Sequence, residues 1–324
     1  MNNSSSSQQP WNIVVYHTWA SILALLGLVP YCRVCWIIWR ELNSTFANSF
    51  YKLVLALGLQ DIIVLAQQLL YAAPSAAFGE QHPWLRNYFF VSGIINNIAS
   101  WNVLWHILAI CLNRLAAVTL LQKYNNFFTD SKVYACVVWC CAASIGTVCL
   151  LYSCGCVWHI PNGMAHRWSC ADYATKCAQY SVMYMQGMSY SMSIAVLLLY
   201  LVVMLRIKGT SGNQSTFLKK ERALVFQFGL VCLVYFFYVF LFWTTSWLIQ
   251  NTYLNPVMGD YVIGSVAIFN SAMNPYLYMT FGSEMRTRFF TAKSTPVLSI
   301  SAITRKPGPS NSYINSTVAV NGFM

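Results

Sequence analysis

Seven long apolar stretches constrain the fold of this chain more than any other feature of its sequence. Each reaches the roughly 20 residues that a helix needs to cross the hydrocarbon core of a membrane. Only 8% of the 324 residues are charged and 57% are apolar, a balance that soluble domains do not show. The sequence therefore predicts an all-α membrane protein, a seven-transmembrane helix bundle. Its helices are expected at about 13–39, 50–73, 88–121, 133–155, 180–206, 222–250 and 257–281.

The chain outside these stretches is short, so we expect no separate soluble domain. Residues 1–12 would form an extracellular N-terminus and residues 13–290 the membrane domain. Arg286, Arg288 and two phenylalanines predict a short amphipathic helix at about 283–290, lying on the membrane surface. Residues 291–324 are rich in Ser, Thr and Pro and cannot bury a core, which predicts a disordered cytoplasmic tail.

The distribution of lysine and arginine predicts how the bundle is oriented. If the N-terminus is outside, fifteen of the nineteen basic residues lie on the inner side and three, Arg86, Arg167 and Lys176, on the outer side. Arg33 lies in the first stretch, near its inner end. The net charge of +11 then reflects topology and attraction to anionic inner-leaflet lipids. We expect a multi-pass plasma-membrane protein that binds no nucleic acid. The patterns that begin at Asn2 and Asn3 are candidate glycosylation sites.

The twelve cysteines divide into two groups. Eight fall inside predicted helices, where a thiol acts as a small apolar packing residue. Cys32 and Cys35 have a zinc-like or redox-like spacing but lack the other ligands, so we expect no metal and no cofactor. The remaining four lie in or beside the second outer loop, which faces an oxidising space. We expect one disulfide, with its pairing open, among Cys154, Cys156, Cys170 and Cys177.

A few polar residues inside the apolar stretches narrow the interpretation. Asp61 is a lone carboxylate midway along the second stretch and needs a partner, because an unpaired charge in lipid is costly. Arg114 lies near the inner end of the third stretch, and Trp139 lies in the middle of the fourth. The last stretch ends in Asn274-Pro275-Tyr276-Leu277-Tyr278, whose proline frees a backbone carbonyl that neighbouring groups must satisfy.

Together these residues resemble the pattern of rhodopsin-like G-protein-coupled receptors. Within that class, the sequence around Asp61 and Arg114 is similar to that of the nematode-type serpentine chemoreceptors. The resemblance implies a chemosensory receptor, not an enzyme, that binds an external small molecule and activates a heterotrimeric G protein, with a sensory cilium as the location. Phosphorylation of the tail for arrestin binding and an inert solvated tail remain open alternatives.

The chain departs from the wider family at several places. Asn113 precedes Arg114 where an acid is usual, so a local salt bridge is absent. No cysteine lies between Cys35 and Cys111, so the usual bridge from the third helix to the second outer loop cannot form. The first helix has Pro30 near the place of its usual asparagine, and no cysteine follows Cys232 to carry a palmitoyl anchor.

The resemblance implies an activation switch and a core polar site. In the switch, Arg114 pairs at rest with Glu221 and is held by two tyrosines on activation; a solvated Glu221 is the alternative. The core site holds water or sodium beside Asp61, or else a protonated Asp61 bonded to Asn274. The switch residues are Arg114, Glu221, Tyr200, Asn274, Pro275 and Tyr278, and the core residues are Asp61, Asn270, Ser271 and Asn274.

A ligand site is expected about 27 Å above Arg114, since Asn96 lies eighteen residues earlier on the same helix at about 1.5 Å each. Asn96 stands where amine receptors carry an aspartate, which favours a neutral or weakly polar ligand. Aromatic residues of the sixth and seventh helices supply walls, although Trp and Tyr also belong to interfacial belts. The candidates are Asn96, Asn97, Ser100, Trp101, Trp243, Trp247 and Tyr261.

Two other functions stay open. A neuropeptide or small-transmitter receptor would have the same fold. A seven-helix transporter or channel would need intramembrane charges along a path, and only Asp61 and Arg114 lie deep enough.

Overall fold

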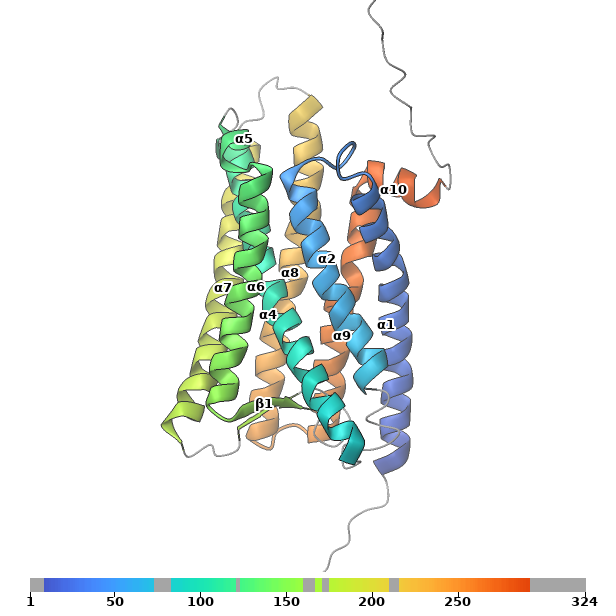
Figure 1. Ribbon diagram of the computed structural model, residues 1–324, viewed down its shortest axis with the longest axis vertical. Coiled ribbons are helices and arrows are strands. Elements are labelled where there is room, and N and C mark those ends of the chain that lie inside the picture. The colour runs from blue at the N-terminus through green and yellow to red at the C-terminus, as the bar shows by residue number, and fades with distance from the viewer. Residues whose placement is uncertain are drawn as a thin grey trace, which may run out of the picture. The chain divides into compact units, whose positions relative to one another are not determined.

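The computed structural model describes residues 9–72, 83–120, 123–159, 167–170, 175–209 and 216–291. Asn2, Asn3 and the tail from residue 292 lie outside this part of the chain. The long helices run side by side in one bundle (Figure 1). They are α1 Gln9–Arg40, α2 Ser49–Gln67, α4 Pro83–Thr119, α6 Asp130–Ser153, α7 Lys176–Gly209, α8 Thr216–Gln250 and α9 Pro256–Phe281. The predicted helix bundle is confirmed.

Shorter elements complete the bundle. A π-helical turn, η1 Gln68–Ala72, continues α2. Helix α5 Tyr124–Phe127 precedes α6, and α10 Ser283–Phe290 follows α9 at the place where the sequence predicts an amphipathic helix. Strands β1 Cys156–His159 and β2 Arg167–Cys170 form an antiparallel hairpin that the sequence did not predict. In Figure 1, α5 and α10 lie at one end of the bundle and β1 at the other. We call these the α5 end and the hairpin end.

Six helices in the described residues are long and apolar enough to cross a membrane: α1, α2, α4, α6, α7 and α8. The seventh, α9, has 26 residues, or about 39 Å of helix, and packs against α1, α2 and α8. Helix α4 has 37 residues, more than a perpendicular span requires, and crosses the bundle obliquely (Figure 1). The predicted length of the third helix is thus confirmed.

The outside of the bundle is apolar. Large side chains such as Val29, Trp39, Val138 and Met183 are each about two-thirds exposed, with values of 66%, 67%, 68% and 68%. A surface of this kind is unfavourable in water and suits the hydrocarbon core of a membrane. The polar residues Asp61, Asn113 and Arg114 are instead fully buried, which places them between helices rather than against lipid.

Two disulfides close the hairpin end. Cys154, which follows α6, is bonded to Cys177 at the start of α7, and Cys156 is bonded to Cys170 across the hairpin. The sequence predicted one bridge among these four cysteines and left its pairing open, so the number was too low. The strand register explains the second bridge, because Cys156 lies directly opposite Cys170. Neither bond involves α4, so the loop is bonded within itself and to α7.

Candidate functional site

The carboxylate of Asp61 ties three helices together in the middle of the bundle. The Tyr31 hydroxyl of α1 and the Asn274 Nδ2 of α9 each donate a hydrogen bond of 2.7 Å to Asp61 Oδ2. Ser271 interacts with the same carboxylate. Three of the four predicted core residues, Asp61, Ser271 and Asn274, are thus brought together. Asn270 is buried nearby on α9 and lines the cavity described below.

Tyr31 is the member of this site that sequence reasoning missed. It follows Pro30 at the place where the first helix lacks its usual asparagine. Gly58, one turn before Asp61, makes room for it, because a Cβ atom there would lie 2.7 Å from Tyr31 Cε1. A glycine on the same helical face as a buried aspartate was a usable sign that a large side chain approaches from a neighbouring helix.

Arg114 lies fully buried near the α5 end of α4. Its Nη2 and Nε donate to Asn113 Oδ1 at 2.8 and 3.3 Å. The guanidinium carbon also lies 4.3 Å from the centre of the Phe50 ring, within the range of a cation–π contact. Asn113, where the wider family has an acid, therefore holds the arginine through an uncharged oxygen.

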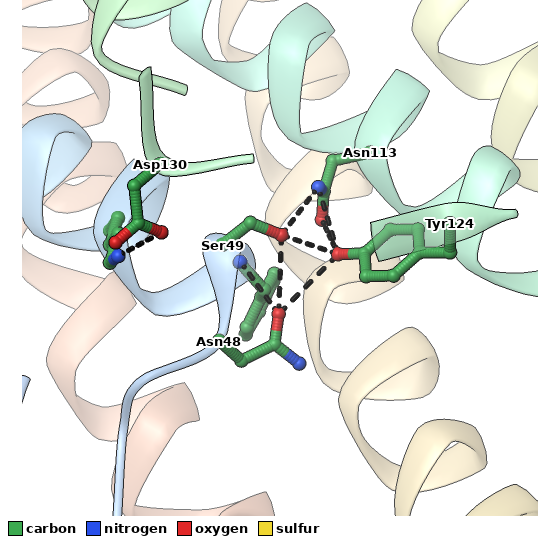
Figure 2. Close-up of polar contacts among 7 residues, drawn as sticks. Asn48, Ser49, Asn113, Tyr124 and Asp130 are labelled. Carbon is green, nitrogen blue, oxygen red and sulfur yellow. Dashed lines mark hydrogen bonds and ion pairs between the residues drawn. The ribbon is translucent and has the colours of Figure 1, made fainter. Parts of the chain in front are cut away.

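A network of hydroxyl and amide groups surrounds Asn113 (Figure 2). Asn113 Nδ2 donates to Ser49 Oγ and to the Tyr124 hydroxyl, both at 3.0 Å. The Tyr124 hydroxyl donates to Oδ1 of Asn48 at 3.4 Å, and that oxygen also caps α2 at Phe50 N, 3.0 Å away. The network joins the start of α2, the end of α4 and helix α5. Tyr124 was missed in the sequence because α5 has only four residues.

An ion pair adds α6 to the same region. Lys52 Nζ contacts Asp130 Oδ1, and Figure 2 shows this pair beside the Asn48 network. Lys52 is nearly buried, with its side chain 6% exposed, while that of Asp130 is 71% exposed. The exposed partner keeps the ion pair in contact with solvent, so its contribution to stability is small.

The other predicted switch residues lie in two places. Tyr200 of α7 is buried, and its hydroxyl donates to Val225 O of α8. Its ring packs on Phe228, whose ring in turn meets Phe50, with centroids 5.9 and 6.2 Å apart. Tyr200 is thereby connected to Arg114 through the rings of Phe228 and Phe50, because the Phe50 ring contacts the guanidinium.

Tyr278 is buried on α9, one turn beyond Asn274 and Pro275. Glu221 belongs to α8, but its side chain lies outside the described part of the chain. The pairing of Glu221 with Arg114 therefore stays a prediction. Trp139, used in the sequence as a landmark of the fourth helix, is 56% exposed and meets Trp105 edge to face at 4.9 Å.

A cavity of about 130 Å³ opens in the half of the bundle nearer the hairpin. It is bounded by α1, α2, α4, α7, α8 and α9, and five of the seven predicted ligand residues line it: Asn96, Asn97, Ser100, Trp101 and Trp243. Trp247 is 55% exposed and stacks near Tyr253 at 5.8 Å, outside the lining. Tyr261 also lies outside the lining and meets Tyr16, which does line the cavity, at 4.8 Å.

Several lining residues were not predicted. Gln68, at the first position of η1, faces the cavity, as do Tyr235 and Tyr238 of α8. Asn270 and Ser271 line the cavity as well, so it reaches the core polar site. The cavity thus runs from the predicted ligand residues to the side chains around Asp61.

Residues 22–283 match the family model described as serpentine type 7TM GPCR chemoreceptor Srx. The chain belongs to this Srx family. Human adenosine receptor A2a is 26% identical over 199 residues, which cover 60% of this chain. Those residues span about half, 46%, of the length of the adenosine receptor. Both comparisons confirm the predicted resemblance to rhodopsin-like receptors and to serpentine chemoreceptors, and membership in a receptor family agrees with the expectation that the chain is no enzyme.

As a member of this family, the chain is a multi-pass membrane protein of the serpentine chemoreceptor type. The departures of this Srx receptor now have structural counterparts. Asn113 replaces the acid beside the arginine, and Tyr31 donates a hydrogen bond to the aspartate of α2. One disulfide crosses the hairpin and another joins the end of α6 to α7, and neither involves α4.

Proposed function

We propose that this Srx receptor binds a small external molecule in the cavity and activates a heterotrimeric G protein at its α5 end. One observation carries the proposal: Asn96, on the cavity wall, and Arg114, in the hydrogen-bonded network at the α5 end, belong to the same helix α4. A ligand that favours one position of α4 also favours one state of the arginine. The shift it produces equals its difference in affinity for the two states.

Activation in this proposal releases Arg114 from Asn113 and from the Phe50 ring. Tyr200 and Tyr278 then hold the freed guanidinium, and Pro275 provides the local flexibility of α9 that moves Tyr278. Glu221 is the resting ion-pair partner. Asp61, Asn270, Ser271 and Asn274 form the polar core that couples the cavity to this movement, with bound water more fitting than sodium because Val103, and no hydroxyl, stands on α4 there.

The proposed orientation places the hairpin end outside the cell. The four bridged cysteines support it, because disulfides persist in an oxidising space. Glycans on Asn2 or Asn3, a plasma-membrane location in a sensory cilium, and arrestin binding to residues 291–324 belong to the same proposal. The proposal also divides the chain into an extracellular N-terminus at 1–12, a membrane domain at 13–290 and a disordered cytoplasmic tail at 291–324.

Adenosine is a reasonable first compound to test, because the human relative is by its name an adenosine receptor. A nucleoside is large for a cavity of about 130 Å³, so the cavity favours smaller molecules. The same size argues against a neuropeptide as the ligand, since a peptide would occupy far more volume.

The test is G-protein activation in cells that express wild type or Arg114→Ala, with an odorant panel and adenosine as stimuli. Surface level is measured on intact cells with an N-terminal tag, which also tests the orientation. Arg40→Ala is the matched control, because Arg40 lies at the same end but contacts only Trp36 among the rings described, at 5.3 Å. A response present in wild type and Arg40→Ala and lost in Arg114→Ala supports the proposal.

Two results would overturn it. An N-terminal tag that antibodies reach only after permeabilisation contradicts the orientation. Ion currents or solute uptake that persist in Arg114→Ala, without a G-protein response in wild type, identify a transporter or channel instead.

A further inference from the structure

Three amide side chains leave polar atoms unpaired on the wall of the cavity. Gln68 Nε2, Asn96 Oδ1 and Asn97 Nδ2 are buried and have no hydrogen-bond partner among the described residues. The three residues are 6%, 4% and 2% exposed, and all line the cavity. Buried polar atoms in folded proteins nearly always have partners, because leaving one unpaired costs free energy. These atoms therefore mark where a bound molecule would form hydrogen bonds.

Other buried polar atoms of the described residues that lack a partner, such as Asn102 Oδ1 and Gln227 Oε1, do not line the cavity. Polar groups next to the three amides do have partners. Gln67 lies beside Gln68 in the chain, and its Oε1 accepts a hydrogen bond from Ser92 of α4. The Ser100 hydroxyl lines the cavity but donates to Asn96 O at 2.8 Å. Gln68 also begins the π-helical turn η1, and such turns are frequent at functional sites.

The lining contains no side chain of Asp, Glu, Lys, Arg or His among its described residues. A charged ligand would lose its hydration there without gaining a counter-charge. The buried acid Asp61 does not line the cavity, and its Oδ2 already accepts hydrogen bonds from Tyr31 and Asn274, although its Oδ1 has no partner among the described residues. The cavity therefore favours an uncharged molecule.

The volume of the cavity and the side chains that line it restrict the kind of ligand further. The cavity holds about 130 Å³, somewhat less than a cavity of about 150 Å³ that binds benzene. Its apolar walls include the rings of Trp101, Tyr238, Phe242 and Trp243. A single ring or a short apolar chain fits such walls, with one polar group directed to the amides.

We propose that the cavity binds an uncharged molecule of about the size of benzene that carries one group able both to donate and to accept a hydrogen bond, such as a hydroxyl. Asn97 and Gln68 donate to this group and Asn96 accepts from it. The ligand class rests on the proposed function, because it names the ligand of the same cavity.

The test measures the melting temperature of purified full-length receptor with four probes that share one ring. They are benzyl alcohol, toluene, benzylamine and benzoate at neutral pH. Benzyl alcohol should raise the melting temperature at concentrations where benzylamine and benzoate do not. Toluene, which lacks the hydroxyl, forms none of these hydrogen bonds and should bind at least about tenfold more weakly.

The Asn97→Leu variant keeps the volume of the side chain and removes its donor. Affinity for benzyl alcohol should fall about tenfold while that for toluene stays within about twofold. Asn251→Leu is the matched control, since Asn251 is exposed, bonds to Trp247 O and lies outside the cavity. Gln68→Leu gives a second variant, judged in the same way, in case Asn97→Leu does not fold.

A charged probe that stabilises as well as benzyl alcohol, no shift with benzyl alcohol, or equal shifts for wild type and the folded cavity variants would overturn the ligand class. Because melting needs no G protein, the two proposals fail separately. Normal shifts without any G-protein response count against the proposed function alone. A G-protein response to charged compounds that is unaffected by Asn97→Leu counts against the ligand class alone.

Discussion

Asn113 holds Arg114 with a neutral amide oxygen, 2.8 Å from Nη2, where a carboxylate would form an ion pair. A hydrogen bond with one charged partner is already about twice as strong as a neutral one, and a carboxylate in place of the amide would add Coulomb attraction to the guanidinium. The resting state of this receptor is therefore restrained less by its own α4 than in relatives with an acid. The shared contacts of Ser49 and Tyr124 with Asn113 spread the restraint over three elements.

Asn113→Asp should lower basal G-protein activity about fivefold at equal surface level. A carboxylate would strengthen the bond to the guanidinium by about 1 kcal/mol and favour the resting state. The measurement is ligand-free signalling in cells that express each variant. Asn251→Asp, which adds the same charge at the hairpin end, should leave basal activity unchanged. Basal activity that stays constant or rises in Asn113→Asp would contradict the role of Asn113.

Helix α10 has eight residues, too few to be stable alone in water, so its contacts with α1 and the end of α9 maintain it. Arg33 of α1 donates from Nη2 and Nε to Phe289 O at 2.9 and 3.2 Å, near the C-terminus of α10. Its guanidinium also lies 5.3 Å from the centre of the Phe289 ring. A cation at this end of a helix pairs with carbonyls that have no partner within the helix. Arg33 thus holds α10 against α1.

Arg33→Ala should speed amide hydrogen exchange in α10 about fivefold, since the loss of these exposed contacts removes about 1 kcal/mol. Mass spectrometry of peptides from residues 283–290 measures the rate. Arg40→Ala removes an arginine from the same helix α1 and serves as the control. Equal exchange rates in the two variants would show that α10 is held by its other contacts instead, the apolar ones and the ion pair of Arg288 with Glu41.

At the scale of the whole bundle, α1, α2 and α9 meet through one carboxylate oxygen, Asp61 Oδ2. Glycines let the helices approach at this level: a Cβ atom at Gly27 would lie 2.5 Å from Ala272 Cβ. In lipid there is no hydrophobic driving force between helices, so close packing and hydrogen bonds such as these hold them together. Helix α1 is therefore held against α2 and α9 by the hydrogen bond of Tyr31 and by the close approach at Gly27.

Tyr31→Phe should lower the stability of the bundle by about 1–3 kcal/mol, because the buried carboxylate loses one of its two short donors while the ring still fills its space. The melting temperature of purified receptor in detergent measures this loss. Tyr180→Phe changes a tyrosine that is 67% exposed and should have almost no effect. An equal decrease in both variants would mean that the Tyr31 hydroxyl contributes nothing specific.

The structure brings together several residues that the sequence singled out, while their functional roles stay predictions. Asp61 and Asn274 were expected in the same polar site and do bond to each other, and Asn96 and Asn97 were expected to face a pocket and do line the cavity. Trp247 was chosen as an aromatic residue at the outer end of the sixth helix, but it does not line the cavity. Tyr124 could not be found, since a four-residue helix has no periodicity to read.

The sequence by itself determined the number of long helices, their approximate limits and the family. Lipid cannot hydrate a backbone, so each apolar stretch of about 20 residues must become a helix whatever its neighbours are. Only the tertiary structure decided which side chains meet: Tyr31 with Asp61, Cys156 with Cys170, and three amides around one cavity. Those pairings depend on the rotation, tilt and spacing of separate elements, which packing between distant residues sets and no local pattern encodes.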